Sequence, residues 1–148
     1  MIVIGLAAAA VLLPLLARLL ITTTDSLAPG GIQDGQLAPC PPTPNCVASR
    51  PYAADSLPPI SYSDTPEQAM QRLVAAVQAE PRSTILTQTE DYLHVQFRSL
   101  VFGFGDDAEF MLMPTTNQIE FRSAARMGRS DLGVNRTRME RITQRMQQ

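Results

Sequence analysis

Hydrophobic and polar positions divide the chain into an apolar start, a proline-rich stretch and a patterned remainder. Residues 1–21 hold a single charge, Arg18, and residues 2–17 hold none. Twenty helical residues span about 30 Å, the thickness of the hydrocarbon core of a bilayer. We therefore predict a signal anchor, that is, a transmembrane helix, over residues 1–21. A cleaved signal peptide and a buried core helix are the alternatives, because both also contain an apolar run.

Residues 22–61 show no sustained period of 2 or 3.6 and contain most of the 12 prolines, so we predict an extended tether. Cys40 and Cys46, the only cysteines of the chain, would close a loop of seven residues within it. Paired cysteines favour an oxidising compartment, so we predict a disulfide and an extracytoplasmic domain that faces the periplasm or the thylakoid lumen. Free structural thiols and reactive cysteines are the other interpretations. Arg18 favours the opposite orientation, because basic residues beside an apolar run favour the cytoplasmic side.

Two helices are predicted beyond this tether. The first begins after Asp64 or Thr65, where a capping side chain precedes a proline, and its apolar residues recur at spacings of three and four. The second covers residues 132–147, where apolar residues form a narrow face and arginines form another. Ser130 or Asp131 is expected to cap this second helix.

Four strand-like runs separate the helices, and the last two are joined by a turn-rich link short enough for a hairpin. This order predicts an α+β domain over residues 62–148: a small antiparallel β-sheet of about four strands with two flanking helices, preceded by the hydrophobic N-terminal helix. Phe102 and Phe104 fall between runs; they are either exposed anchors or part of the edge of the core, and we expect the edge of the core. The runs are residues 83–89, 92–100, 108–113 and 118–124.

Composition excludes several kinds of site. The 12 basic and 14 acidic residues nearly balance, which argues against a protein that binds nucleic acid through bulk charge. One histidine and two cysteines cannot supply the four ligands of a Cys/His zinc site. We therefore expect no nucleic-acid partner, no metal and no cofactor.

Charge is segregated along the domain. Residues 83–121 carry six acids and one arginine, whereas residues 122–148 carry seven arginines and two acids. Adjacent strands naturally place such opposite charges together, so we expect structural ion pairs across the sheet. The acids concerned are Asp106, Asp107 and Glu109, and the arginines are Arg122, Arg126 and Arg129.

A second interpretation of the arginines is an anion site at the turn 128–136, which opens the last helix. Helix N-termini present unpaired N–H groups, and arginine can grip carboxylate or phosphate oxygens with two N–H groups. Asp131 opposes an anion there unless its carboxylate caps the helix. The ligand would be a small anion or an anionic lipid headgroup, and the candidate binding residues are Arg122, Arg126, Arg129, Ser130, Asn135 and Arg136.

Catalysis would have to use His94, the only histidine. It would act with Asp106, Asp107 or Glu109 as acid-base or metal-binding groups. His94 lies on the polar face of its strand, where a structural role is the simpler interpretation. The sequence contains neither a Walker loop nor a dinucleotide-binding glycine motif. It therefore favours a protein that is not an enzyme, although a hydrolytic or metal-dependent enzyme stays open.

The residues that could carry chemistry come in four motifs and resemble one family. The chain is similar, over about residues 37–145, to the bacterial and plastid proteins known as domain of unknown function 1499. This resemblance implies no activity, because none is established for the family. Ala125 stands where the family usually has serine, and members often follow a membrane or export segment. The four motifs are residues 40–46, 92–94, 102–110 and 122–136.

Together these features predict a membrane-anchored, extracytoplasmic and non-catalytic binding or assembly module that presents a surface to a protein partner. An anion-binding or lipid-headgroup-binding protein is the second hypothesis, with its pocket at the arginine-rich turn before the last helix. An enzyme that uses His94 and nearby carboxylates is the third.

Overall fold

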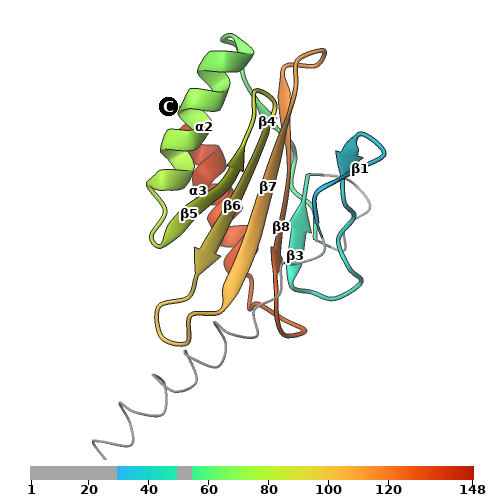
Figure 1. The fold of residues 1–148 in the computed structure, drawn as a ribbon, viewed down its shortest axis with the longest axis vertical. Coiled ribbons are helices and arrows are strands. Elements are labelled where there is room, and N and C mark those ends of the chain that lie inside the picture. Colours follow the sequence, from blue (N-terminus) through green and yellow to red (C-terminus); the bar gives the residue numbers. More distant parts are fainter. Residues whose placement is uncertain (1–29, 50–54) are drawn as a thin grey trace, which may run out of the picture.

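The computed structural model describes residues 30–49 and 55–148 of the chain (Figure 1). The predicted anchor, residues 1–21, lies outside these described residues. Neither helix within them is long and apolar enough to cross a membrane. The helices are α2 (Pro66–Gln78) and α3 (Val134–Met146), and the strands are β1 (Ile32–Gln33), β2 (Gln36–Leu37), β3 (Cys46–Ala48), β4 (Ile60–Ser61), β5 (Ser83–Gln88), β6 (Tyr92–Arg98), β7 (Gly105–Met113) and β8 (Gln118–Ala125).

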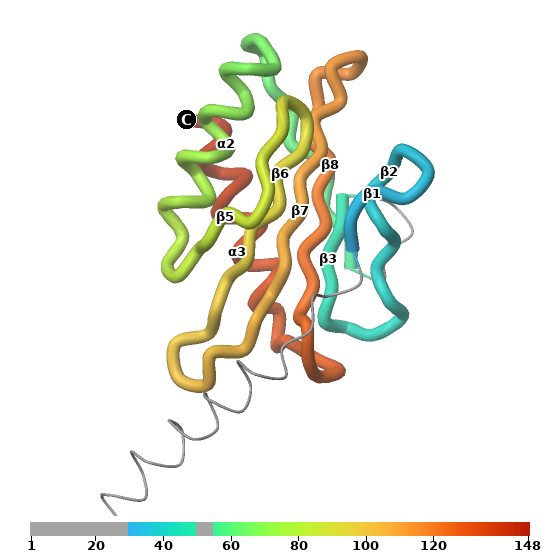
Figure 2. Tube along the Cα trace, in the orientation of Figure 1, coloured from blue at the N-terminus to red at the C-terminus, as the bar shows by residue number. Residues whose placement is uncertain are grey.

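A six-stranded antiparallel sheet forms the centre of the domain. Its strands follow the order β3-β8-β7-β6-β5, and β4 also pairs with β8. Helices α2 and α3 cover one face of this sheet (Figure 1). Strands β1 and β2 form a separate hairpin, and the segment 30–45 that contains it lies on the side of the sheet away from the helices (Figure 2). The α+β class with two helices is therefore confirmed.

The sheet is larger than the predicted four strands. Residues 22–61 were expected to form a tether, yet within this range β3 and β4 both pair with β8, and β1 pairs with β2. Each of these strands has only two or three residues, too few to show a period of 2 among the prolines. Their pairing is also long-range: Cys46 lies opposite Ala124, and Ile60 lies opposite Ile119. Local pattern therefore could not reveal them.

Helix α2 begins as its sequence predicts. Thr65 is the N-cap, its side chain accepts a hydrogen bond from the backbone N–H of Gln68, and the Gln68 side chain accepts one from the backbone N–H of Thr65. This capping box satisfies two backbone donors that a helix start otherwise leaves unpaired. The buried stripe of α2 packs on the sheet with the core residues of α3 and consists of Ala69, Met70, Leu73, Ala76 and Val77.

Strand β7 is the longest strand and is buried on both faces of the sheet. Ala108, Phe110 and Leu112 contribute to the apolar core beneath the helices. The alternate residues Asp107 and Glu109 are also buried, on the opposite face. A strand with acids on one buried face requires partners for them, and this requirement positions the site described below.

The predicted disulfide joins Cys40 to Cys46 and closes the loop that leads into β3. Cys46 is itself buried at the edge of the sheet. The bond therefore holds the segment 30–45 close to a strand of the central sheet.

Removing the disulfide should lower stability by about 2 kcal/mol, because the unfolded chain regains the entropy of the closed loop. Urea unfolding of the Cys40→Ser/Cys46→Ser variant, followed by circular dichroism, measures this loss. The unmodified chain in reductant is the control and should match the variant. An unchanged free energy of unfolding in the variant would show that the loop contributes nothing.

Candidate functional site

The face of the sheet beneath residues 30–45 carries a buried charged cluster. Antiparallel register places Glu109 of β7 directly opposite Arg122 of β8. Both side chains are almost fully buried, and Arg122 Nη1 lies 3.0 Å from Glu109 Oε2. A buried carboxylate is tolerated when a cation and further donors surround it.

Glu109 receives two further hydrogen bonds. Tyr92 Oη, from β6, donates to Glu109 Oε1 at 2.7 Å, and the backbone N–H of Gly31 donates to the same oxygen. Burial, together with the adjacent Glu109 carboxylate, raises the pKa of Tyr92. Gly30 lies so close that a Cβ there would overlap Glu109 Oε2. The backbone of residues 30 and 31 thus lies directly against the Glu109 carboxylate, and a side chain at position 30 would have to displace that carboxylate.

Asp107 forms a second cluster on the same face. Arg126 donates to both carboxylate oxygens, with Nε–Oδ2 and Nη2–Oδ1 distances of 2.7 Å, and His94 Nε2 lies 2.8 Å from Oδ1. Burial alone would raise the pKa of Asp107, but the hydrogen bonds from His94 and Arg126 outweigh it and lower the pKa to about 2. Asp107 therefore stays ionised at neutral pH and acts as an acceptor rather than as a proton donor.

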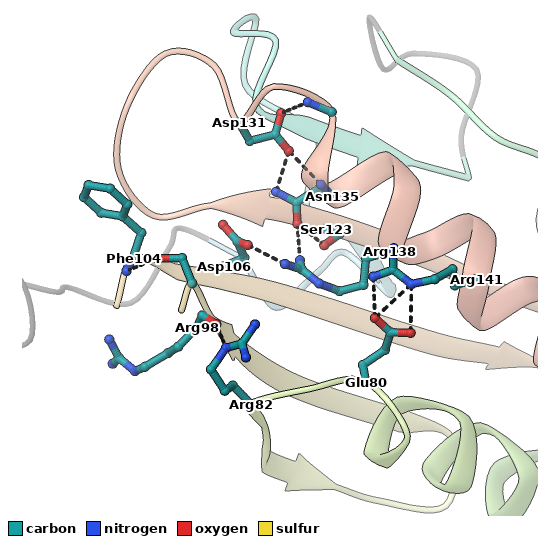
Figure 3. A network of polar contacts seen from close by, with 12 residues as sticks. Glu80, Arg82, Arg98, Phe104, Asp106, Ser123, Asp131, Asn135, Arg138 and Arg141 are labelled. Atoms are coloured by element: carbon teal, nitrogen blue, oxygen red, sulfur yellow. Dashed lines mark hydrogen bonds and ion pairs between the residues drawn. The ribbon is translucent and has the colours of Figure 1, made fainter. Parts of the chain in front are cut away.

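A third network lies on the opposite face, where α3 begins (Figure 3). Arg138 Nη2 donates to Asp106 Oδ2 at 2.7 Å, and Arg138 Nη1 donates to Asn135 Oδ1 at 2.8 Å. Ser123 Oγ donates to the same Asn135 oxygen. The Arg138 guanidinium also stacks 4.4 Å from the centre of the Phe97 ring. This network bonds α3 to β7 and β8.

Burial raises the pKa of Asp106, although its ion pair with Arg138 opposes the shift. Asp106 and Asp107 are neighbours in the chain, but the pleat sends them to opposite faces and their pKa values move in opposite directions. His94 therefore meets Asp107 and not Asp106.

The N-cap residue of α3 is Gly133, not Ser130 or Asp131 as predicted, but the side chain of Asp131 still bonds the start of the helix. Its carboxylate accepts hydrogen bonds from the backbone N–H of Gly133 at 3.1 Å and of Asn135 at 2.8 Å, and from the Asn135 side chain (Figure 3). The helix starts at Val134, two residues later than predicted, because Leu132 and Gly133 have φ angles of 55° and 77°, outside the helical region.

The six residues predicted to bind an anion do not surround one space. Arg122 and Arg126 bond acids on the face away from the helices, and Asn135 is buried in the network beneath α3. Arg136 pairs with Asp55 and Glu140. Arg129 and Ser130 are exposed in the turn itself. Among the described residues, no group of three His, Cys, Asp or Glu side chains could hold a metal ion.

Two loops at one end of the sheet expose apolar side chains, and we call residues 99–104 and 126–134 the loop end. Figure 1 shows the loops that join β6 to β7 and β8 to α3 at this end. A cavity of about 410 Å³ lies between them and is lined by Ser99, Phe104, Asp106, Ala125, Met127, Gly128, Ser130, Asp131 and Val134.

The exposure of two aromatic side chains in the loop end differs from what the sequence predicted. Phe102 and Phe104 were expected at the edge of the core, but they are 44% and 40% exposed, with ring centres 5.6 Å apart. The signal available in the sequence was two aromatics in a glycine-spaced loop, outside any strand. The exposed apolar side chains of the loop end are Leu100, Val101, Phe102, Phe104, Met127, Leu132 and Val134.

Replacing Asp107 with asparagine should destabilise the protein by about 3 kcal/mol at pH 7, because the buried Arg126 would lose the counter-charge of Asp107. Since the folded pKa of Asp107 is about 2, its contribution is present above about pH 4 and is lost as the pH falls towards 2. Urea unfolding between pH 7 and pH 2.5 should therefore show a shallower acid dependence in Asp107→Asn.

Glu90→Gln, at an exposed position in the turn between β5 and β6, is the matched control for the loss of one carboxylate. It should unfold like the unmodified chain at pH 7. Equal stability of Asp107→Asn and Glu90→Gln at pH 7 would contradict a stabilising role for the Asp107 cluster.

Comparison with known families accounts for this arrangement of motifs. The family described as "Protein of unknown function (DUF1499)" matches residues 36–146, which run from β2 to the end of α3 and include the disulfide, the charged networks and the loop end. Comparisons with curated proteins and with solved structures found no match. As its motifs predict, the chain belongs to the DUF1499 family.

Proposed function

We propose that this protein is a membrane-anchored, extracytoplasmic binding or assembly module without catalytic activity. One contrast carries the proposal: the charged motif residues of the sheet bond one another inside the fold, whereas the loop end exposes apolar side chains around a cavity. Exposed apolar patches are typical of surfaces that bind a partner.

The contacts of His94 and the carboxylates support binding rather than catalysis. A general base must reach the proton that it removes, but Asp107 and Glu109 are each only 1% exposed. Asp107 already accepts from two Arg126 nitrogens and contacts His94, and Glu109 accepts from Tyr92, Arg122 and a backbone N–H. These groups are engaged with the fold, which favours a structural role for them over a hydrolytic one.

The disulfide and the apolar sequence of residues 1–21 support the proposed location. Disulfides persist mainly in oxidising compartments, and the Cys40–Cys46 bond closes a loop that joins the sheet. An apolar run of this length suits a bilayer span. The domain would then face the periplasm or the thylakoid lumen, tethered by residues 22–29.

A second proposal is an anion or lipid-headgroup pocket at the turn before α3. Its support is Arg129, which is exposed and has no ion-pair partner among the described residues, beside the exposed Ser130. Ser130 also lines the cavity of the loop end. The support is narrower than that for the first proposal, because Arg122, Arg126 and Arg136 already pair with acids.

The location can be tested in intact cells and in spheroplasts. We expect the full chain to stay in the membrane fraction after carbonate washing and to be digested by protease added outside spheroplasts. A maleimide that adds mass to thiols should label Cys40 and Cys46 only after reduction, because the disulfide protects both. Two thiols that react without reductant, or a domain protected from external protease, would contradict the proposed location.

The second proposal can be tested by calorimetry on the full chain in detergent, with phosphate, sulfate and glycerophosphate as probes. An anion pocket should bind a probe with a Kd below about 1 mM, and Arg129→Ala should weaken binding about tenfold or more. Arg72→Ala is the matched control, because Arg72 is partly exposed on α2, outside the turn and the loop end. Absence of binding at millimolar probe concentrations would rule out this pocket.

A further inference from the structure

We propose that the loop end inserts into the surface of the bilayer that holds residues 1–21, in a leaflet containing anionic lipid. This inference rests on the membrane anchor of the proposed function and names the bilayer interface as the partner of the apolar end. Four features of the described residues support it: the exposed apolar tips, an unfavourable leucine conformation, the distribution of charge, and the short connection to the apolar segment.

The apolar side chains of the loop end come from two loops far apart in the sequence. Phe102 and Phe104 lie between β6 and β7, whereas Met127 and Leu132 lie between β8 and α3. All four are at least two-fifths exposed. Apolar side chains at neighbouring loop tips can enter the boundary between headgroups and acyl chains together, without any change in the sheet behind them.

Among the residues of the loop end, Leu132 gives the most specific evidence. Its side chain is 94% exposed, and its φ angle of 55° lies in the left-handed region that side chains other than glycine and asparagine rarely adopt. Neither the local backbone nor the aqueous surface favours leucine at this position. An apolar environment would favour leucine at this position, and the boundary between headgroups and acyl chains of a bilayer is such an environment.

Charge distinguishes the two ends of the domain. Arg82, Arg98 and Arg129 lie at or beside the loop end, where β5 begins, β6 ends and α3 is about to begin. At the opposite end, Glu67 and the neighbouring residues of the turn 89–91 line an open groove beside the start of α2, and Glu90 and Asp91 are exposed there. Anionic headgroups attract the first end and repel the second.

The same arginines argue against a second copy of this chain as the partner. Two loop ends facing each other would bring like charges together around the apolar tips, which is unfavourable. A bilayer with anionic lipid instead satisfies both the apolar tips and the arginines that flank them.

The connection to the apolar segment is short. Eight residues, 22–29, separate Ile21 from Gly30, so the two can be at most about 30 Å apart. Gly30 is fixed against Glu109, and four residues of β7, about 13 Å, separate Glu109 from the end of the strand at Gly105. The domain must therefore lie close to the membrane that holds the apolar segment, within reach of contact through its loop end.

The absence of tryptophan from the chain allows a direct test. The full chain would be reconstituted in vesicles of phosphatidylcholine with phosphatidylglycerol, carrying a single tryptophan as Leu132→Trp or Phe102→Trp. Thr115→Trp, exposed in the turn between β7 and β8 at the opposite end, is the matched control. Fluorescence would be compared between ordinary lipids and lipids brominated in the upper acyl chain, which quench only on contact.

We expect brominated lipid to remove about half of the emission of Leu132→Trp and Phe102→Trp, because interfacial side chains lie about 5–10 Å into the boundary, and to leave that of Thr115→Trp unchanged. Adding Arg129→Glu should reduce the quenching in vesicles that contain phosphatidylglycerol. These results together would support the inference.

Two failures can be told apart. If the full chain does not co-sediment with the vesicles, the membrane anchor of the proposed function is wrong and the inference falls with it. If the chain co-sediments but neither loop-end tryptophan is quenched, or Thr115→Trp is quenched equally, the anchor stands and the inference alone is wrong. A blue shift that depends on protein concentration without quenching by bromine would identify a second copy as the partner and overturn the inference.

Discussion

Two buried carboxylates on the central strand constrain the rest of the domain. Burying the side chains of Asp107 and Glu109 is tolerated only if cations and hydrogen-bond donors surround them. β8 supplies Arg122, Arg126 follows directly after β8, β6 supplies a tyrosine and a histidine, and Gly31 supplies a backbone N–H. A slip of one residue in the register of β7 would turn both acids into the apolar core beneath the helices. The polar clusters therefore specify the register of three strands and the docking of residues 30–45.

Ion pairs between arginines and buried acids also attach the helices to the rest of the fold. Arg138 reaches from α3 to Asp106, and Arg141 donates from Nε and Nη2 to the carboxylate of Glu80, which follows α2 and is buried (Figure 3). Burial would raise the pKa of Glu80, but hydrogen bonds from Arg141 and Arg145 outweigh it and lower the pKa. All 12 basic residues of the chain are arginines. A planar guanidinium can bond two acceptors at once, which suits buried carboxylates better than the single ammonium of lysine.

The pairing of arginines with acids inside the fold leaves a different kind of side chain exposed at each end of the domain. The buried charged residues of the motifs pair with one another. The charged motif residues therefore hold the strands and helices together. The two ends of the domain then differ in what they expose: the loop end exposes apolar side chains, and the opposite end has an acidic groove. The conformation of the second loop of the loop end is set by the positive φ angles of Leu132 and Gly133 and by the hydrogen bonds that Asp131 accepts from the backbone N–H groups of Gly133 and Asn135.

Sequence by itself determined the features that depend on neighbours in the chain: the capped start of α2, the alternation of β6, the α+β class, the cysteine pair and the family. Local periodicity and turn chemistry carry these signals over a few residues. Only the tertiary structure decided that β3 and β4 join the sheet and that Asp106 and Asp107 face opposite sides to meet Arg138 and Arg126. It also decided that two distant loops form one apolar end. These outcomes depend on strand register between segments up to about 80 residues apart, which no local pattern encodes.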